Sequence, residues 1–199
     1  MSTSGHSTRT LLLSKKQPDL LLVSQGSAGN IDPQALQESS GISQIRAFNI
    51  TDLVEDKVYN YANDGQMLGW GLRNSVGVAE EPITGGIFSV ENSMDEVRRK
   101  GADIHEDDPG EEMNFHGFLN GSTENQGGNY GYPDCLALWG TDIPDVGSMK
   151  VGSQFSHEDS GSVDDAACAN DYVAPRLTFQ VCQPYVSLNR FSTSTNMIL

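Results

Sequence analysis

The protein has 199 residues, enough to bury the core of one domain or of one large piece of a domain. Its 12 Lys and Arg stand against 27 Asp and Glu, and the formal net charge of −15 argues against nucleic-acid and anionic membrane partners, because both would be repelled. A hydrophobic content of 37% with 21 glycines is typical of a soluble, loop-rich β protein, and no apolar run approaches the roughly 18 residues of a membrane helix.

The first residues and the cysteines bear on the compartment. Residues 1–6 have neither a basic start nor an apolar core, so they do not form a secretory signal. The glycosylation sequons that begin at Asn49 and Asn120, together with three cysteines that can supply one disulfide, nevertheless point to an extracellular protein. We therefore expect this chain to be an interior portion of a secreted protein that has lost its beginning.

Short apolar segments follow one another along the first part of the chain. Residues 9–14 and 20–27 are predicted to form a hairpin across a polar turn. Residues 42–51 and 57–61 are predicted to be two outer strands. Four short strands separated by polar loops are the plan of a β-propeller blade.

The central stretch, residues 69–93, repeats this plan with an apolar strand after an arginine, a Pro/Gly turn and a second strand. Arg73 follows Arg9 by 64 residues (73 − 9), and Ser93 follows Ser27 by 66 residues (93 − 27). A similar offset at both ends of the unit indicates an internal repeat. A third copy is expected to begin at residues 175–179.

Helix signals are sparse. Residues 93–100 are predicted to make one or two helical turns, with a serine at the N-cap and basic residues at the end. Residues 146–165 are rich in Gly, Ser and Asp and are predicted to be a long surface loop. The sequence therefore predicts an all-β protein.

Four motifs stand in a fixed order along the chain. Leu-Arg-Asn-x-x-Gly begins at Leu72, Glu-Asn-Ser at Glu91, Glu-Glu-Met-Asn at Glu111 and Gly-Gly-Asn-Tyr-Gly-Tyr-Pro at Gly127. In this order they resemble the sugar dehydrogenases that use pyrroloquinoline quinone (PQQ). The similarity is closest to the fungal pyranose and sorbosone dehydrogenase branch, and it spans residues 4–180.

The resemblance implies a fold and a domain organisation. Relatives of this type form a six-bladed β-propeller of roughly twice this length, so residues 1–180 are expected to be part of such a propeller, with about three blades present. Residues 181–199 no longer read like the family and are expected to be an aberrant or disordered tail.

The resemblance places the catalytic base at His6. Oxidation of a sugar at its anomeric carbon needs a base near neutral pKa to take the hydroxyl proton while hydride leaves carbon 1, and histidine suits that role. The alternative is a surface histidine in a frayed terminus.

Cofactor-binding residues are expected in two of the motifs. Arg73 and Asn74 match the pair that contacts the quinone, where a guanidinium and an amide stabilise the charge that develops on its oxygens. Glu91 and Asn92 fall in the segment next to the cofactor. The alternative for the Arg-Asn pair is a strand cap in water.

The same resemblance implies a calcium ion that bridges to PQQ. Ser93 and Met94 occupy the positions whose main-chain carbonyls hold this ion, although relatives often carry Gly-Pro there. Glu111 and Glu112 match an acidic motif beneath the cofactor and are candidate metal ligands. The remaining acidic run, residues 105–110, lacks the spacing of an EF-hand loop and is expected to be solvated.

The cysteines are expected to form one bridge. Cys135 follows the last motif, and Cys168 lies at the end of the long acidic loop, so that a bond between them closes this loop. Cys182 is left unpaired in that scheme.

Two functions remain open on the sequence alone. The first is a PQQ-dependent dehydrogenase that oxidises a pyranose, a sorbosone or a related sugar, with an external electron acceptor such as a haem domain or a cytochrome. The second is a truncated, non-catalytic propeller module that binds without turnover. Because the chain is about half of a propeller, we expect it to be inactive alone.

Overall fold

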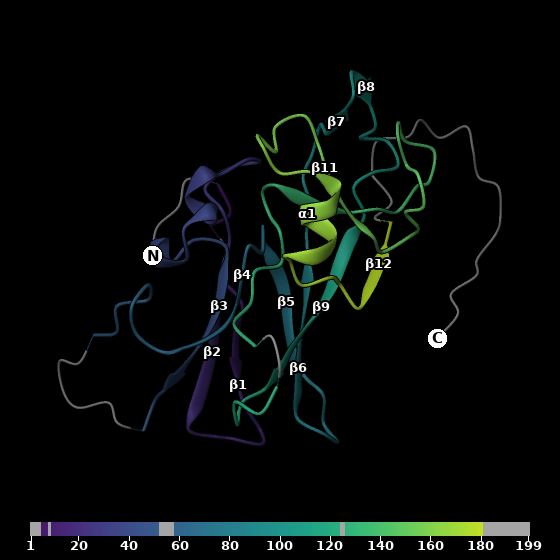
Figure 1. The fold of residues 1–199 in the computed structure, drawn as a ribbon. Coiled ribbons are helices and arrows are strands. Elements are labelled where there is room, and N and C mark those ends of the chain that lie inside the picture. Colours follow the sequence, from purple (N-terminus) through teal and green to yellow (C-terminus); the bar gives the residue numbers. More distant parts are fainter. Residues whose placement is uncertain (1–4, 8, 52–57, 124–125, 181–199) are drawn as a thin grey trace, which may run out of the picture.

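The computed structural model describes residues 5–7, 9–51, 58–123 and 126–180. Two four-stranded antiparallel sheets lie side by side in it (Figure 1). The first sheet has the order β1-β2-β3-β4, with β1 (Leu11–Leu13), β2 (Leu20–Gln25), β3 (Gln44–Asn49) and β4 (Gln66–Trp70). The second has the order β12-β9-β6-β5, with β5 (Ser75–Glu80), β6 (Gly86–Glu91), β9 (Glu111–Phe118) and β12 (Leu177–Phe179).

Smaller elements fill the connections. Two 3-10 turns, η1 (Pro33–Leu36) and η2 (Glu38–Ser40), lie between β2 and β3. The short strands β7 (Arg98–Arg99) and β8 (Ala102–Asp103) form one ribbon, and β10 (Cys135–Ala137) and β11 (Gln154–Ser156) form another. One α-helix, α1 (Asp165–Asn170), packs against β11. Among the described residues, no helix is long and apolar enough to span a membrane.

Several strand predictions are confirmed. The two predicted hairpins are present as β1-β2 and β5-β6, and residues 42–51 contain β3. The predicted strand at 57–61 is wrong for residues 58–61, which hold no strand, while Lys57 lies outside the described residues. The fourth strand of the first sheet is β4 instead, because it pairs with β3 from Gln44 to Ala47.

The predicted third repeat is also corrected. Leu177–Phe179 does not open a new unit but pairs antiparallel with β9 and completes the second sheet. The described residues therefore contain two four-stranded sheets of one plan rather than three, and a closed propeller stays a prediction.

The predicted helix at 93–100 is wrong. Glu96 and Lys100 adopt φ values of 58° and 50°, in the left-handed region that a right-handed helix cannot use. Arg98–Arg99 is a short strand instead, and Met94 and Val97 are buried in a core cluster. Long-range packing has overridden the local helix signal here.

The predicted surface loop at 146–165 is wrong in part. It contains β11, where Phe155 is fully buried, and it leads into α1. The side chain of Asp164 caps this helix by accepting from the N–H of Ala167 at 2.8 Å. An Asp before two alanines was the local signal for this helix.

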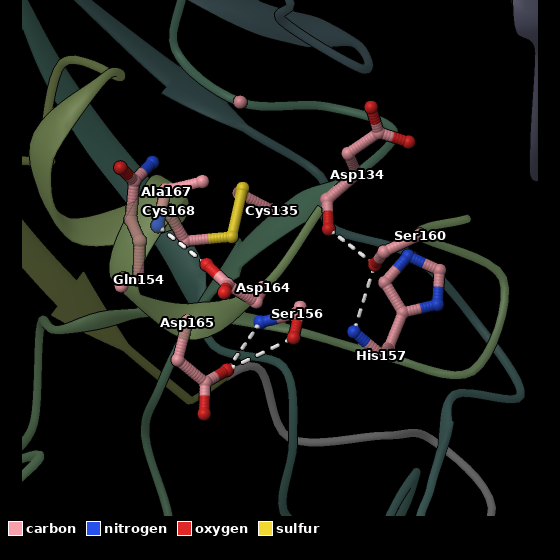
Figure 2. The surroundings of a disulfide bond; sticks show 12 residues. Asp134, Cys135, Gln154, Ser156, His157, Ser160, Asp164, Asp165, Ala167 and Cys168 are labelled. Atoms are coloured by element: carbon pink, nitrogen blue, oxygen red, sulfur yellow. Dashed lines mark hydrogen bonds between the residues drawn. A yellow bond between two sulfur atoms is a disulfide. The ribbon is translucent and has the colours of Figure 1, made fainter. Parts of the chain in front are cut away.

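The predicted disulfide is confirmed. Cys135 in β10 and Cys168 in α1 are joined, with their Cα atoms 5.5 Å apart and both residues buried (Figure 2). This bond closes a loop with a sequence separation of 33 and holds α1 against the β10-β11 ribbon. Cys182 lies outside the described residues.

The apolar core has two main parts. One lies at the junction of the large sheets and includes Leu22, Ile45, Leu68, Ile87 and Tyr130. The other is centred on the β10-β11 ribbon and also holds residues from the η1 turn and the β7 region. Its fully buried members are Ala35, Leu138 and Phe155.

The Gly-Gly-Asn-Tyr-Gly-Tyr-Pro segment, residues 127–133, ties the sheets together. It runs parallel to the end of β4, where Trp70 donates its N–H to Gly128 O at 3.1 Å and accepts from the N–H of Tyr130 at 2.8 Å. Gly71 has φ +65°, and a Cβ there would lie 2.0 Å from Asn129 Oδ1. Only glycine fits this crossing.

Candidate cofactor site at the strand ends

The candidate site is built at one end of β5 and β6. Arg73 and Asn74 lie in the connection between β4 and β5, immediately before β5. Glu91 ends β6 and is paired with Ser75 of β5. The two motifs predicted to bind the cofactor are therefore neighbours in the structure.

Arg73 is buried and held by four hydrogen bonds, with a side chain that is 7% exposed. Its Nε donates to Asn30 O at 3.2 Å, and its Nη2 donates to Asn30 Oδ1 at 2.9 Å and to Asp95 Oδ2 at 3.0 Å. Its Nη1 donates to Asn92 O at 3.5 Å. A guanidinium has five N–H donors, so these contacts leave one N–H of Nη1 for a ligand.

Asn74 lies beside His6 at a close approach of the backbone. The amide of Asn74 donates from Nδ2 to Asn92 Oδ1 at 3.2 Å. A Cβ added to Gly26 would lie 2.7 Å from Asn74 Oδ1, 2.9 Å from the Cβ of His6 and 3.3 Å from Arg73 O. Gly26 thus allows the predicted base and the predicted quinone pair to meet.

His6 is oriented by Ser27. Its Nδ1 lies 3.1 Å from Ser27 O and 2.9 Å from Ser27 Oγ, and the Ser27 hydroxyl donates to Gly29 O at 2.7 Å. We assign the Nδ1–H tautomer because Nδ1 faces a carbonyl, which makes Nε2 the basic nitrogen. Burial, followed by the charge of Arg73, lowers the pKa of His6 below its usual 6.5, so the imidazole is neutral at pH 7.

The oxygen groups predicted to hold calcium share a second part of the site. Ser93, Met94 and Glu111 line one pocket together with Asp95 and Glu96. Glu111 Oε2 accepts the N–H of Ser93 at 2.9 Å, and burial raises the pKa of this carboxyl. All of these donors are oxygens, as a hard cation requires.

That pocket has no side-chain cage for a metal. Among the described residues, no group of three or more His, Cys, Asp or Glu side chains is placed to hold an ion. A calcium ion at this position would therefore depend on the main-chain carbonyls of Ser93 and Met94, with Glu111 as the neighbouring carboxyl.

Glu91 and Glu112 lie deeper, as cross-strand partners on β6 and β9. Both line a small cavity between the sheets with Tyr130 and Tyr132. Burial raises the pKa of Glu91 to about 7 and that of Glu112 to about 8. The hydrogen bonds that each carboxyl accepts have a smaller, opposite effect on its pKa. Glu112 thus faces Glu91, and it is not among the residues that line the pocket of Glu111.

A buried polar chain continues from Glu91 into the second sheet. Glu91 Oε1 accepts from Ser75 Oγ at 2.6 Å and from Ser89 Oγ at 2.7 Å. Ser89 Oγ also lies 2.8 Å from Nε2 of His116, whose pKa is lowered to about 4 by burial. No partner of His116 can be read from the sequence, because its neighbours come from other strands.

Sequence reasoning missed Asn30 and Asp95, which surround Arg73. The Tyr132 hydroxyl belongs to the same group and donates to Asn30 O at 3.1 Å. The available signal was the repeat itself, because Asn30 and Asp95 are 65 residues apart, close to the offsets of 64 and 66.

Known proteins resemble this chain over most of its length. Residues 1–184 match the family model described as TrAA12-like. The chain is 55% identical over 183 residues to the pyrroloquinoline quinone-dependent sugar dehydrogenase of Hypocrea jecorina. It is 37% identical over 186 residues to the pyrroloquinoline quinone-dependent pyranose dehydrogenase of Coprinopsis cinerea. The chain belongs to this fungal family of PQQ-dependent sugar dehydrogenases.

Solved structures give the same result. The calcium structure of the Trichoderma reesei family AA12 enzyme superposes with a TM-score of 0.87 at 55% identity, covering 90% of this chain and 45% of that one. The holo form of the Coprinopsis cinerea pyranose dehydrogenase PQQ domain gives a TM-score of 0.78 at 36% identity, covering 87% and 42%.

The chain spans less than half the length of these family members. The matched region is 90% of this chain but 42% of the Hypocrea jecorina protein, and 89% of this chain but 24% of the Coprinopsis cinerea protein. The sequence is therefore consistent with a partial chain, as predicted.

The residues present fit the group that the family uses. One N–H of Arg73 remains for a ligand, and a buried guanidinium attracts the carboxylates and quinone oxygens of PQQ. The Cβ of His6, the Oδ1 of Asn74 and the backbone oxygen of Arg73 meet at Gly26. The pocket of Ser93 and Glu111 offers oxygens to a cation next to it.

Proposed function

We propose that this chain forms part of the active site of a PQQ-dependent dehydrogenase that oxidises the anomeric carbon of a pyranose, a sorbosone or a related sugar. When bound, the quinone accepts a hydride. The observation that carries the proposal is the meeting of His6, Arg73 and Asn74 around Gly26, from segments separated by more than 60 residues of sequence.

His6 supplies the base in this proposal. The bond from Nδ1–H to Ser27 O makes Nε2 the basic nitrogen, which takes the proton of the anomeric hydroxyl, and the lowered pKa keeps it unprotonated at neutral pH. Arg73 and Asn74 orient the cofactor and stabilise negative charge on its oxygens, since their donors are fixed before the ligand arrives. Glu91, at the end of β6, and Asn92, directly after it, support Arg73 and Asn74.

Calcium belongs to the same proposal. The main-chain carbonyls of Ser93 and Met94 would hold the ion with Glu111, and the ion would balance the carboxylates of PQQ in a protein of strongly negative charge. We propose that Glu112 supports Glu91, since its carboxyl is buried against that residue.

The enzyme would act outside the cell and pass its electrons to an external acceptor such as a haem domain or a cytochrome. The sequon at Asn120 supports the first part, because its side chain is exposed in a turn where Oδ1 accepts from Ser122.

Two proteins test the function. One is the 199-residue chain. The other is a hybrid in which residues 1–180 replace the matching part of the Hypocrea jecorina dehydrogenase, so that the remaining length is supplied. With PQQ, calcium and an aldose, we expect turnover in the hybrid and none in the chain alone, because the chain lacks the rest of the ring that encloses the cofactor. A hybrid that binds PQQ but never reduces it favours the binding-module alternative.

The base is tested by His6→Ala in the hybrid. We expect turnover to fall by roughly 10²- to 10⁴-fold while PQQ stays bound, because that is the usual contribution of a positioned base. Asn170→Ala is the control, since Asn170 is exposed on α1 and lines neither the pocket of Glu111 nor the cavity of Arg73. Unchanged turnover in His6→Ala removes His6 from the mechanism.

A further inference from the structure

Asn30 makes two of the four contacts that hold Arg73. It lies in the connection between β2 and η1, and it accepts from Nε through its carbonyl and from Nη2 through its side chain. Two acceptors from one residue, on two different nitrogens, fix both the position and the rotation of a planar guanidinium. The other side-chain acceptor, from Asp95, touches Nη2 alone.

Asn30 is itself held by the loop after β6 and by the 127–133 segment. Its Nδ2 donates to Asp95 O at 2.7 Å, and its Oδ1 accepts the N–H of Asp95 at 2.8 Å. The Tyr132 hydroxyl donates to the carbonyl of Asn30 at 3.1 Å. Asn30 therefore connects the loop after β2, the loop after β6 and the 127–133 segment beside the Arg73 side chain.

We propose that Asn30 is a positioning residue that sets the direction of the Arg73 guanidinium, so that its remaining Nη1 N–H is presented to the carboxylates or quinone oxygens of PQQ. This inference rests on the proposed function for the identity of the ligand. It does not need Asn30 to touch the ligand, because all of its described contacts are to the protein.

The ion pair with Asp95 is the weaker restraint. The Asp95 side chain is 65% exposed, so its attraction for Arg73 is screened by water and salt. Asn30 is only partly exposed, and it makes two hydrogen bonds to this buried guanidinium against one from Asp95. Loss of Asn30 is thus expected to release Arg73 more than loss of Asp95 does.

The first measurement follows Arg73 in the 199-residue chain without cofactor. In NMR, the Arg73 Nε–H should exchange slowly with water because it is buried and bonded to Asn30 O. Asn30→Ala should raise this exchange rate about tenfold or more, since a bond to a charged group is lost from the same guanidinium. Asn30→Asp keeps an oxygen at Oδ1 and should restore most of the protection, whereas Asp95→Ala should change it less than Asn30→Ala does.

His6 gives a second reading of the same movement. Among the described residues, the charged groups that act on its imidazole are Arg73, Arg9 and Asp95, and Arg73 has the largest effect of the three. If Asn30→Ala lets the guanidinium move away, the pKa of His6 should rise toward 6.5, as followed by its ring protons. Asn170→Ala is the matched control, because Asn170 is exposed on α1 and bonds only to Ala166 O among the contacts of the described chain. It should leave both readings unchanged.

The last measurement is PQQ affinity in the hybrid, by calorimetry with calcium. Asn30→Ala should weaken binding about tenfold, in the direction of Arg73→Ala, and Asn170→Ala should not. One outcome is that the parent binds PQQ, Asn30→Ala binds it equally well, and the exchange rate of the Arg73 Nε–H is unchanged. The positioning role is then wrong while the proposed function stands. If the parent binds no PQQ, the proposed function is wrong, and the role of Asn30 in it fails too. Should Asn30→Ala not fold, Asn30→Ser is measured with the same expectations.

Discussion

The two large sheets share one strand order and differ in what they bury. The first sheet buries aliphatic side chains, with Leu22, Ile45 and Leu68 fully buried, and its buried polar residues in the described chain, such as Gln44 and Arg46, include no carboxyl and no histidine. The second sheet buries carboxyls and a histidine, with Glu112 on β9 facing Glu91 on β6 and His116 behind them. A common strand order thus leaves the chemistry of the interior open, and the candidate ligand-binding residues lie at one end of the polar sheet.

Their connections differ as well. The strands of the first sheet are joined by loops and two 3-10 turns, whereas residues 119–176 separate β9 from β12 in the second. This insertion carries α1, the β10-β11 ribbon and the disulfide, and its own core includes Leu138 and Phe155. Apolar packing in the insertion offsets the cost of a polar interior in the sheet beside it.

Removal of the disulfide should give the largest effect, and mainly in the second sheet. In Cys135→Ala/Cys168→Ala, we expect the free energy of unfolding to fall by about 3 to 4 kcal/mol, because the reduced loop gains entropy in the unfolded chain. Urea unfolding measures the total, and hydrogen exchange should show more loss at β9 than at β3. Cys182→Ser is the control. Equal loss of protection from hydrogen exchange in both sheets would mean that the insertion stabilises the whole molecule.

The polar interior should make stability depend on pH. The folded pKa values of Glu91 and Glu112 lie above the unfolded value of 4.5, so the folded state holds more protons and stability falls as pH rises from about 4.5 to 8. The pKa of His116 is lowered to about 4, so its contribution grows as pH rises to 6.5. Above pH 6.5, His116 therefore no longer opposes the fall in stability that Glu91 and Glu112 cause.

Glu112→Gln tests this directly. It should reduce the decline above pH 6.5 by up to about 1.4 kcal/mol per pH unit, the value for one proton. Glu38→Gln, at an exposed position on η2, is the control and should follow the parent curve. A parent protein whose stability is flat between pH 6.5 and 8 would show that the buried carboxyls are ionised at little cost.

The smallest expected effect concerns the join between the sheets. Glu80 of β5 accepts from the Ser14 hydroxyl at 2.7 Å and from the N–H of Lys15 at 2.6 Å, in the turn that links β1 and β2. Because these bonds are half exposed, Glu80→Ala should cost about 1 kcal/mol in urea unfolding. Glu96→Ala, at an exposed position away from this turn, is the control. A loss beyond that of the disulfide would make this join central to folding.

Local pattern was enough to predict the hairpins, because alternation and turn residues stand close together in the sequence, whereas the disulfide was predicted from where the three cysteines lie along the chain. It failed at 93–100, where Asp95 bonds to Asn30 and Arg99 pairs with Asp165 at 2.6 Å. These partners lie 65 and 66 residues away. No local signal contains them, so a sequence that looked helical was taken into loops by tertiary contacts.

The site shows the same division. The motifs named His6, Arg73 and Asn74 as functional, and the structure brings them together around Gly26. Their second layer, Asn30 above all, was invisible because its role is defined only by the guanidinium that it contacts. Residues that touch a ligand are easier to find in a sequence than residues that hold them in place.

The 127–133 segment has a consequence for synthesis. Its partner on the first sheet, Trp70, leaves the ribosome 60 residues before Tyr130 does (130 − 70). Until then the outer edge of β4 is unpaired, although β1, β2 and β3 are already available to fold. A nascent chain that stalls before Gly128 therefore presents an open strand edge, which is the feature that chaperones and other unfinished chains bind.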